Sequence, residues 1–193
     1  MVDLGEIQTV YYLVAATGVM VAAFYYIQNM RNAEKNKRIE LSTRITEKIG
    51  SKEFNQTFVE LAYIQWKDID DFLKRYDSGA NTAESQENFG KRWWVWSTYD
   101  NLGYLLKENL VDESLIFNSQ GAYAVNCWGH WLPIIDYYRR KQMGPRWLEN
   151  FEYLARRMWG IGKERGSVSV GFRDGLMFDG FKDVFEQRTT VTQ

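Results

Sequence analysis

Two side chains whose types suit catalysis or metal binding lie three residues apart in this chain, Cys127 and His130. They are its only cysteine and its only histidine, and their spacing would place both on one face of a helix. A general base needs a positioned nucleophile or an orienting carboxylate, and a zinc site needs further cysteine or histidine ligands, which the chain lacks. We therefore predict a buried structural pair, with a catalytic or redox role as the alternative, and no metal or cofactor site.

Two other stretches resemble functional motifs but lack residues that those motifs require. The first, GIGK at residues 160–163, lacks the earlier glycine and the following serine or threonine of a phosphate-binding loop. The second, DIDD at residues 68–71, lacks the alternating oxygen ligands and the central glycine of a calcium loop. Its surroundings place it in the middle of a helix, as a solvated face. The sequence thus predicts that the protein is not an enzyme.

Tryptophan is abundant, with eight residues in the chain, and three of them fall in the run Trp93-Trp94-Val95-Trp96. Adjacent helix positions differ by about 100°, so these side chains cannot share one face. The apolar spacing places Phe89, Trp93 and Trp96 on the inner side of the helix, so Trp94 points elsewhere. We predict that Trp94 fills a second core layer; the alternatives are an exposed residue of a protein interface or a contact with the membrane interface.

The elements that must position these residues begin with an apolar stretch from Ile7 to Met30, 24 residues without one Asp, Glu, Lys or Arg. As a helix it would extend roughly 36 Å, which is enough to cross a hydrocarbon core of about 30 Å. We therefore predict a membrane span. The residues assigned to it are Ile7, Tyr11, Tyr12, Gly18, Ala22, Tyr25, Tyr26 and Ile27.

The charges that flank this stretch predict its orientation. Acidic residues precede it, whereas a cleaved secretory signal begins with basic residues and ends at a small-residue cleavage site. Because basic residues beside a span stay in the cytoplasm, we expect a single-pass anchor in the cell membrane, with the N-terminus outside and the C-terminal domain inside. The cytoplasmic flank consists of Arg31, Lys35, Lys37 and Arg38. Within the span, Gly18 and Ala22 form a small-residue pair through which two copies could associate.

The rest of the chain has the composition of a folded domain. The sequence is 45% hydrophobic and 16% aromatic, and its formal net charge is −1, so nucleic acid is not expected as a partner. We divide the whole chain into an anchor (1–30), a membrane-proximal polar helix (31–50), a cytoplasmic helical domain (51–163) and a glycine-rich tail (164–193). The expected fold is all-α, an aromatic-rich bundle of four to five helices after the span.

The spacing of apolar residues predicts individual helices. They cover residues 31–49, 51–76, 82–109, 113–118, 121–142 and 146–160. Pro133 should kink the fifth of these. Six glycines between Gly160 and Gly180 argue against a long helix in the tail. A hairpin at Asp174-Gly175 and an apolar helical face of three phenylalanines both remain open there.

Four charged residues near the end of the domain are candidates for a structural or interaction role. Arg139 or Arg140 should pair with Glu149 or Glu152 across the short turn at Gly144-Pro145. Such a pair would fix the orientation of two helices. The alternative is a site for an anion or a partner peptide built on the two arginines.

Several ordered blocks resemble a prokaryotic family of unknown function. They are YDNLGYLL at residues 99–106, LVD at 110–112, CW at 127–128, WLP at 131–133, YRR at 138–140 and NFEYL at 150–154. The resemblance implies one N-terminal span followed by a cytoplasmic helical domain, and it implies no catalytic residue.

Together these patterns favour a membrane-anchored helical module that binds another protein, as a scaffold, an adaptor or a sensor output. Its partners would be the lipid bilayer and a protein. The alternative is an accessory structural subunit of a larger membrane complex, and a membrane-bound enzyme is the third hypothesis.

Overall fold

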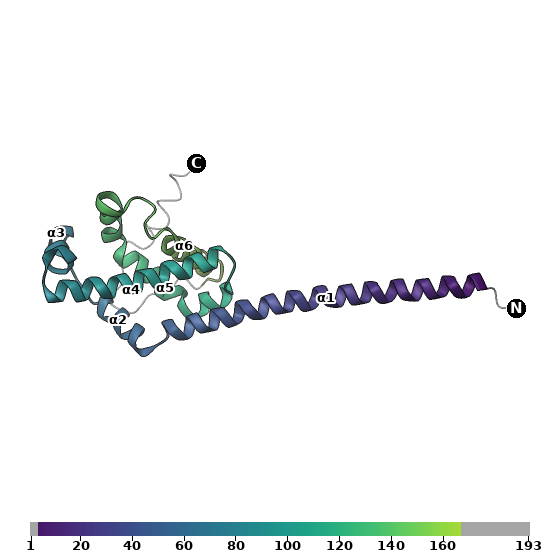
Figure 1. Ribbon diagram of the computed structural model, residues 1–193. Helices are drawn as coiled ribbons and strands as arrows, with labels where there is room; N and C mark the ends of the chain where they lie inside the picture. The colour runs from purple at the N-terminus through teal and green to yellow at the C-terminus, as the bar shows by residue number, and fades with distance from the viewer. Residues whose placement is uncertain (1–3, 167–193) are drawn as a thin grey trace. The chain divides into compact units, whose positions relative to one another are not determined.

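The computed structural model describes residues 4–166, and all of their regular structure is helical. The all-α prediction is therefore confirmed for the described part of the chain (Figure 1). The chain forms two compact units, Met1–Glu40 and Leu41–Gln193. The predicted tail, with its hairpin or its phenylalanine face, lies outside the described residues from position 167 onward.

The first unit consists of the greater part of α1, a helix that runs from Leu4 to Ile49 without a break. Among the described residues it is the one helix that is long and apolar enough to cross a membrane. Its apolar side chains between Ile7 and Met30 are exposed along the whole stretch. The basic residues of the predicted cytoplasmic flank are exposed as well, namely Arg31, Lys35, Lys37 and Arg38.

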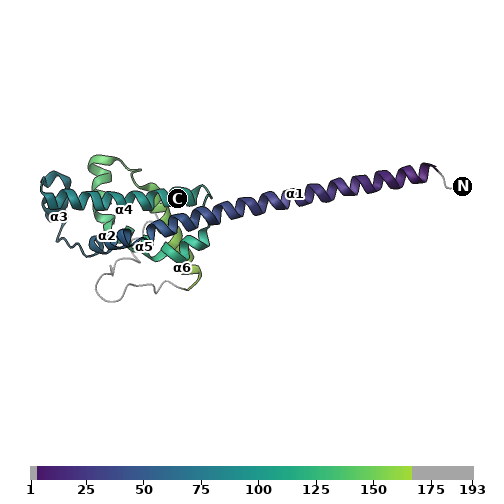
Figure 2. The ribbon, with the colours of Figure 1, turned by 60° about the horizontal axis from the view of Figure 1, so that its bottom comes forward.

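The second unit contains the end of α1 and five further α-helices (Figure 1, Figure 2). They are α2 (Lys52–Ala62), α3 (Ile69–Tyr76), α4 (Ala83–Lys107), α5 (Glu113–Tyr138) and α6 (Glu149–Glu164). A short 3-10 turn, Ser78–Ala80, precedes α4, and a π-helical turn, Arg139–Met143, follows α5. Helix α6 packs against both α4 and α5.

Side-chain caps start four of these helices, because the first N–H groups of a helix have no partner within it. Ser51, Asp68, Thr82 and Asp112 accept hydrogen bonds from the backbone N–H groups of Phe54, Asp71, Ser85 and Leu115. The backbone N–H of Asp112 in turn donates to the buried Ser42 hydroxyl over 2.7 Å. This bond joins the start of α5 to the last turns of α1.

The prediction of one helix over residues 51–76 is wrong. The chain leaves the helix after Ala62 and begins α3 only at Ile69. The Trp66 ring in the connecting segment stacks on Trp131 of α5, with ring centroids 5.0 Å apart. Packing of this aromatic ring overrides local helix propensity, and Asp68 is the cap of α3 rather than a residue in the middle of a helix.

The predicted break between residues 118 and 121 is also absent, since α5 is continuous from Glu113 to Tyr138 and contains Pro133. Gly121 does not end the helix. Its missing side chain leaves room for the Phe117 ring, which would lie 3.1 Å from a Cβ at this position. Helix α6 likewise continues through Gly160 to Glu164, beyond the predicted end.

Helix α4 approaches the start of α6 closely at Gly103. A Cβ on Gly103 would lie 1.9 Å from the backbone oxygen of Asn150. One turn earlier, the Asp100 carboxylate accepts hydrogen bonds from the backbone N–H groups of Asn150 and Phe151, at 3.1 and 2.9 Å. Two of the sequence blocks that resemble the uncharacterised family therefore meet at this contact.

Replacing Gly103 with alanine should destabilise the domain by about 2 to 3 kcal/mol, because α4 and α6 would have to separate to admit the methyl group. Gly90→Ala is the matched control on the same helix, since nothing lies within 4 Å of a Cβ there. The control should stabilise the protein by about 0.5 to 1 kcal/mol. Denaturant unfolding of the full chain in detergent would measure both, and equal effects would contradict the close-contact argument.

Candidate functional site

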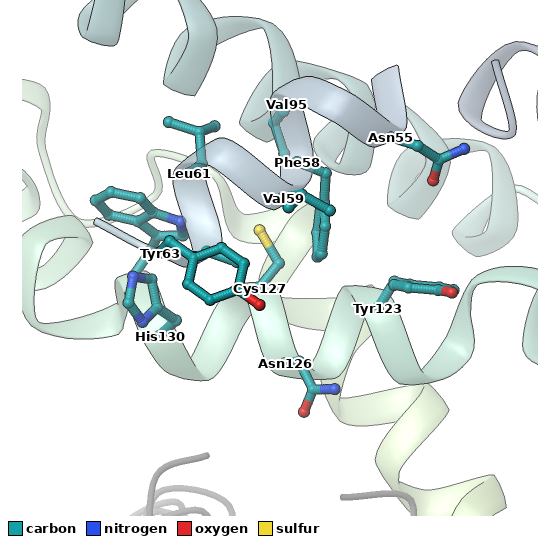
Figure 3. A pocket seen from close by; sticks show the side chains of 12 residues that line it. Asn55, Phe58, Val59, Leu61, Tyr63, Val95, Tyr123, Asn126, Cys127 and His130 are labelled. Carbon is teal, nitrogen blue, oxygen red and sulfur yellow. The ribbon is translucent and has the colours of Figure 1, made fainter. Parts of the chain in front are cut away.

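The second unit contains a largely apolar cavity of about 220 Å³ between α2, α4 and α5 (Figure 3). Side chains between residues 55 and 63 form one wall, side chains between residues 123 and 131 form the other, and Val95 of α4 completes the lining. The deepest lining is fully buried, with Leu61, Val95 and Trp131 each at most 2% exposed.

The mouth of this cavity, in contrast, is accessible to solvent. Tyr63 is 63% exposed and Tyr123 is 39% exposed, and Val59 between them is also exposed. The Phe58 ring packs edge-on against Tyr123, with centroids 5.6 Å apart. The cavity thus has an exposed, partly aromatic rim and a largely apolar interior.

The predicted pair, Cys127 and His130, lines the α5 wall of this cavity. The Cys127 side chain points toward α2 (Figure 3). The His130 ring lies against Trp66 and Trp131, with centroids 4.8 and 4.9 Å away. Sequence spacing placed the two residues on one face, but only the structure shows that α2 leaves space in front of them.

Burial keeps both side chains uncharged at neutral pH. Desolvation lowers the pKa of His130 to about 4, although a hydrogen bond to the backbone of Ile64 acts in the opposite direction. Desolvation also raises the pKa of the Cys127 thiol far above its ordinary value. A thiolate nucleophile is therefore disfavoured here. The described residues contain no cluster of three or more His, Cys, Asp or Glu that suits a metal ion.

Of the four charged residues singled out near the turn, Arg139 and Glu152 are paired. Their side chains meet at 2.7 Å and are only 10% and 21% exposed. Burial alone would raise the pKa of the Glu152 carboxyl, but hydrogen bonds from Arg139 and Arg156 outweigh this effect and lower it. Arg140 is exposed, and Glu149 pairs with Arg146 at 2.8 Å.

Sequence reasoning overlooked a buried cation on α4. Arg92 is 0% exposed, and its Nη1 donates to the Asn88 side chain over 2.6 Å. Its guanidinium lies 4.6 Å from the centre of the Phe72 ring, which is within cation–π range. Burial lowers the pKa of Arg92 to about 10, so the group stays charged at neutral pH. The sequence did contain a signal for its burial, because Arg92 lies one turn before Trp96 and therefore on the core side of the helix.

The tryptophans of α4 are distributed differently from the prediction that Trp93 faces inward. Trp93 is 47% exposed, whereas Trp96 is buried and Trp94 packs edge-on against Phe54 at 5.4 Å. The Trp93 ring stacks between Phe89 and Trp147, with centroids 6.2 and 6.4 Å away. We call these three residues, Phe89, Trp93 and Trp147, the Trp93 row.

Residues 12–158 match a family model described as Domain of unknown function (DUF4760). This finding agrees with the resemblance to an uncharacterised family that the sequence blocks indicated. No curated protein and no solved structure matches the chain. The matched residues include the cavity, the Trp93 row and the contact between Gly103 and α6.

The lowered pKa of His130 predicts a pH-dependent stability. In the unfolded chain the imidazole takes up a proton near its ordinary pKa of 6.5, but in the folded protein it does so only near pH 4. The unfolded state therefore binds more protons within this window, and stability falls as the pH drops through it. The loss attributable to His130 should reach up to about 3 kcal/mol.

His130→Gln removes the titrating group, so its stability should fall less than that of the wild type between pH 7 and pH 4. Denaturant unfolding of both proteins as a function of pH would measure this. The carboxylates contribute equally to the two stability curves, so the difference between the curves reports on His130. Parallel curves would show that His130 is not desolvated in the folded protein.

Proposed function

The chain belongs to the family described as a domain of unknown function (DUF4760), and from this starting point we propose that it is a membrane-anchored helical module that binds another protein. The observation that carries the proposal is the Trp93 row on the surface of the second unit. Large aromatic side chains, tryptophan above all, are enriched at the centres of protein interfaces. The module would act as a scaffold, an adaptor or a sensor output, without catalysis of its own.

The membrane part of the proposal rests on α1. Its apolar stretch has the length of a span, and the basic flank that starts at Arg31 favours a cytoplasmic location for the helical domain. The single cysteine of the chain suits a reducing compartment. We therefore propose a prokaryotic cell membrane as the site of action, with the N-terminus outside.

The Trp93 row has the physical properties of a binding surface. Ring stacking on both sides holds the indole of Trp93 in one orientation, so little side-chain entropy would be lost when a partner covers it. Gly90 lies three residues before Trp93 on α4, and nothing lies within 4 Å of a Cβ at this position. A partner would therefore have room beside the row. Tyr104, on the same helix, is exposed to a similar extent, at 50%, and provides a comparison.

Photo-crosslinking would test this surface. A benzophenone amino acid at position 93 of the full chain, in its native membrane, should give one discrete protein adduct, and the same group at position 104 should not. Trp93→Ala should weaken recovery of that protein about 30-fold, as expected for a hot-spot residue worth about 2 kcal/mol. Tyr104→Ala is the matched control and should leave recovery unchanged.

Two results would contradict the proposal. A lipid adduct at position 93 would place the row at the membrane surface instead. Equal adducts at positions 93 and 104 would mean that α4 has no preferred binding face. Thermal melting of Trp93→Ala would accompany either result, to show that the half-exposed residue is not needed for folding.

The second candidate function is an accessory subunit of a larger membrane complex. It is favoured by the small-residue face of the apolar stretch, where nothing lies within 4 Å of a Cβ on Gly18. A membrane-bound enzyme is the third hypothesis, and turnover that disappears in His130→Ala would support it.

Gly18→Ile and Ala22→Ile should disrupt helix association through this face, because the added branches keep two backbones apart. A membrane two-hybrid assay of the full chain should lose most of its signal in each variant. Met20→Ile, on the opposite side of the helix, is the control and should retain the signal. Unchanged signals in all three variants would exclude the small-residue face as a contact.

A further inference from the structure

We propose that the cavity between α2, α4 and α5 is a binding site for a small neutral molecule, about the size of one aromatic ring and carrying one hydrogen-bonding group. This site is separate from the Trp93 row, and the proposal does not depend on the protein-binding function. Three properties of the cavity support it: its size, the chemistry of its lining and its accessibility.

The size of the cavity fits a ligand of this class. Its volume of about 220 Å³ exceeds the roughly 150 Å³ at which a cavity lined by apolar side chains can hold benzene. It is smaller than the pockets of about 300 Å³ or more that accept drug-sized molecules. A single ring with one substituent therefore fills it best.

The lining excludes charged ligands. Among the residues that the structure describes, no Asp, Glu, Lys or Arg side chain lines the cavity. Its ionisable members include His130 and Cys127, and burial holds both in their neutral forms at pH 7. An ion that entered would lose its hydration without gaining a counter-charge, which costs far more than the transfer of a neutral molecule.

The polar side chains Asn55, Asn126 and His130 belong to α2 and α5 and are less buried than the apolar side chains that form the deepest part of the lining. Leu61, Val95 and Trp131 make the bottom apolar, whereas His130 sits in the α5 wall. An aromatic ligand would pack its ring against these three apolar side chains. Its polar substituent would meet the His130 imidazole or the tyrosine hydroxyls of the rim. Such sparse polar groups in an apolar site fix the orientation of a ligand.

The rim provides the route of access. Tyr63 lies in the segment that follows α2, and Tyr123 lies on α5, so the opening is bounded by two different elements. Both side chains are exposed to solvent at the rim. A ligand could therefore enter without unfolding of the core.

The test compares two probes of nearly equal shape, neutral para-fluorobenzamide and anionic para-fluorobenzoate. Fluorine NMR line broadening would be recorded with the full chain in nanodiscs of uncharged lipid, and empty nanodiscs would serve as the blank for partitioning. We expect the amide to broaden in a saturable manner and the carboxylate to remain sharp. Broadening by both probes alike, or by neither, would overturn the proposal.

A cavity-filling variant assigns the binding to this site. Ala62 lines the cavity, so Ala62→Leu should fill it and weaken the amide at least about tenfold. The matched control is Gln56→Leu, which adds the same side chain to an exposed position of α2 outside the lining. Undiminished binding to a folded Ala62→Leu variant would overturn the assignment.

A second measurement needs no substitution. His130 is the only histidine of the chain and lines the cavity, so the NMR signal of its imidazole, seen after isotope labelling of histidine alone, reports on occupancy. Saturating para-fluorobenzamide should shift this signal, whereas para-fluorobenzoate at the same concentration should not. An unchanged signal under saturating amide would show that the probe binds elsewhere and would contradict the proposal, even if Ala62→Leu failed to fold.

Discussion

The contact between α4 and the start of α6 is the constraint on which the rest of the helical unit depends. Leu148, the residue before α6, has a left-handed backbone with φ of 56° and makes no side-chain cap. The Asp100 carboxylate of α4 caps α6 instead, from another helix. The approach is close because Gly103 has no side chain. With α6 fixed there, the Phe151 ring stacks on Tyr99 at 5.2 Å and meets Trp128 of α5 at 5.1 Å.

This arrangement makes α4 the central helix. It also explains why four consecutive residues of α4 face four different environments. Positions that differ by about 100° point in successive directions around a helix. Trp93 faces outward in its row, Trp94 packs on α2 through Phe54, Val95 lines the cavity, and Trp96 meets Trp131 of α5 at 5.5 Å. Because the contact with α6 fixes the rotation of α4 about its axis, it also decides which of these residues reaches solvent.

Much of the fold was predictable because its signals are local. The uncharged stretch, Gly50 after α1, and the caps Ser51, Thr82 and Asp112 are all visible in the sequence. The errors arose where tertiary packing decides. No glycine or proline marks the interruption between α2 and α3, which depends on the stacking of Trp66 on α5. The inward assignment of Trp93 failed for a similar reason, since apolar spacing cannot show that Phe89 and Trp147 support an exposed ring.

The candidate site was predictable only in part, because its geometry comes from segments far apart in the chain. The spacing of Cys127 and His130 indicated one shared face, and the lack of further ligands argued against a metal site. What the spacing could not indicate is the space that α2 leaves opposite them. The desolvation that lowers the pKa of His130 weakens the imidazole as a general base at neutral pH. The same desolvation leaves an uncharged polar group in an apolar wall, which is the lining that the proposed neutral ligand requires.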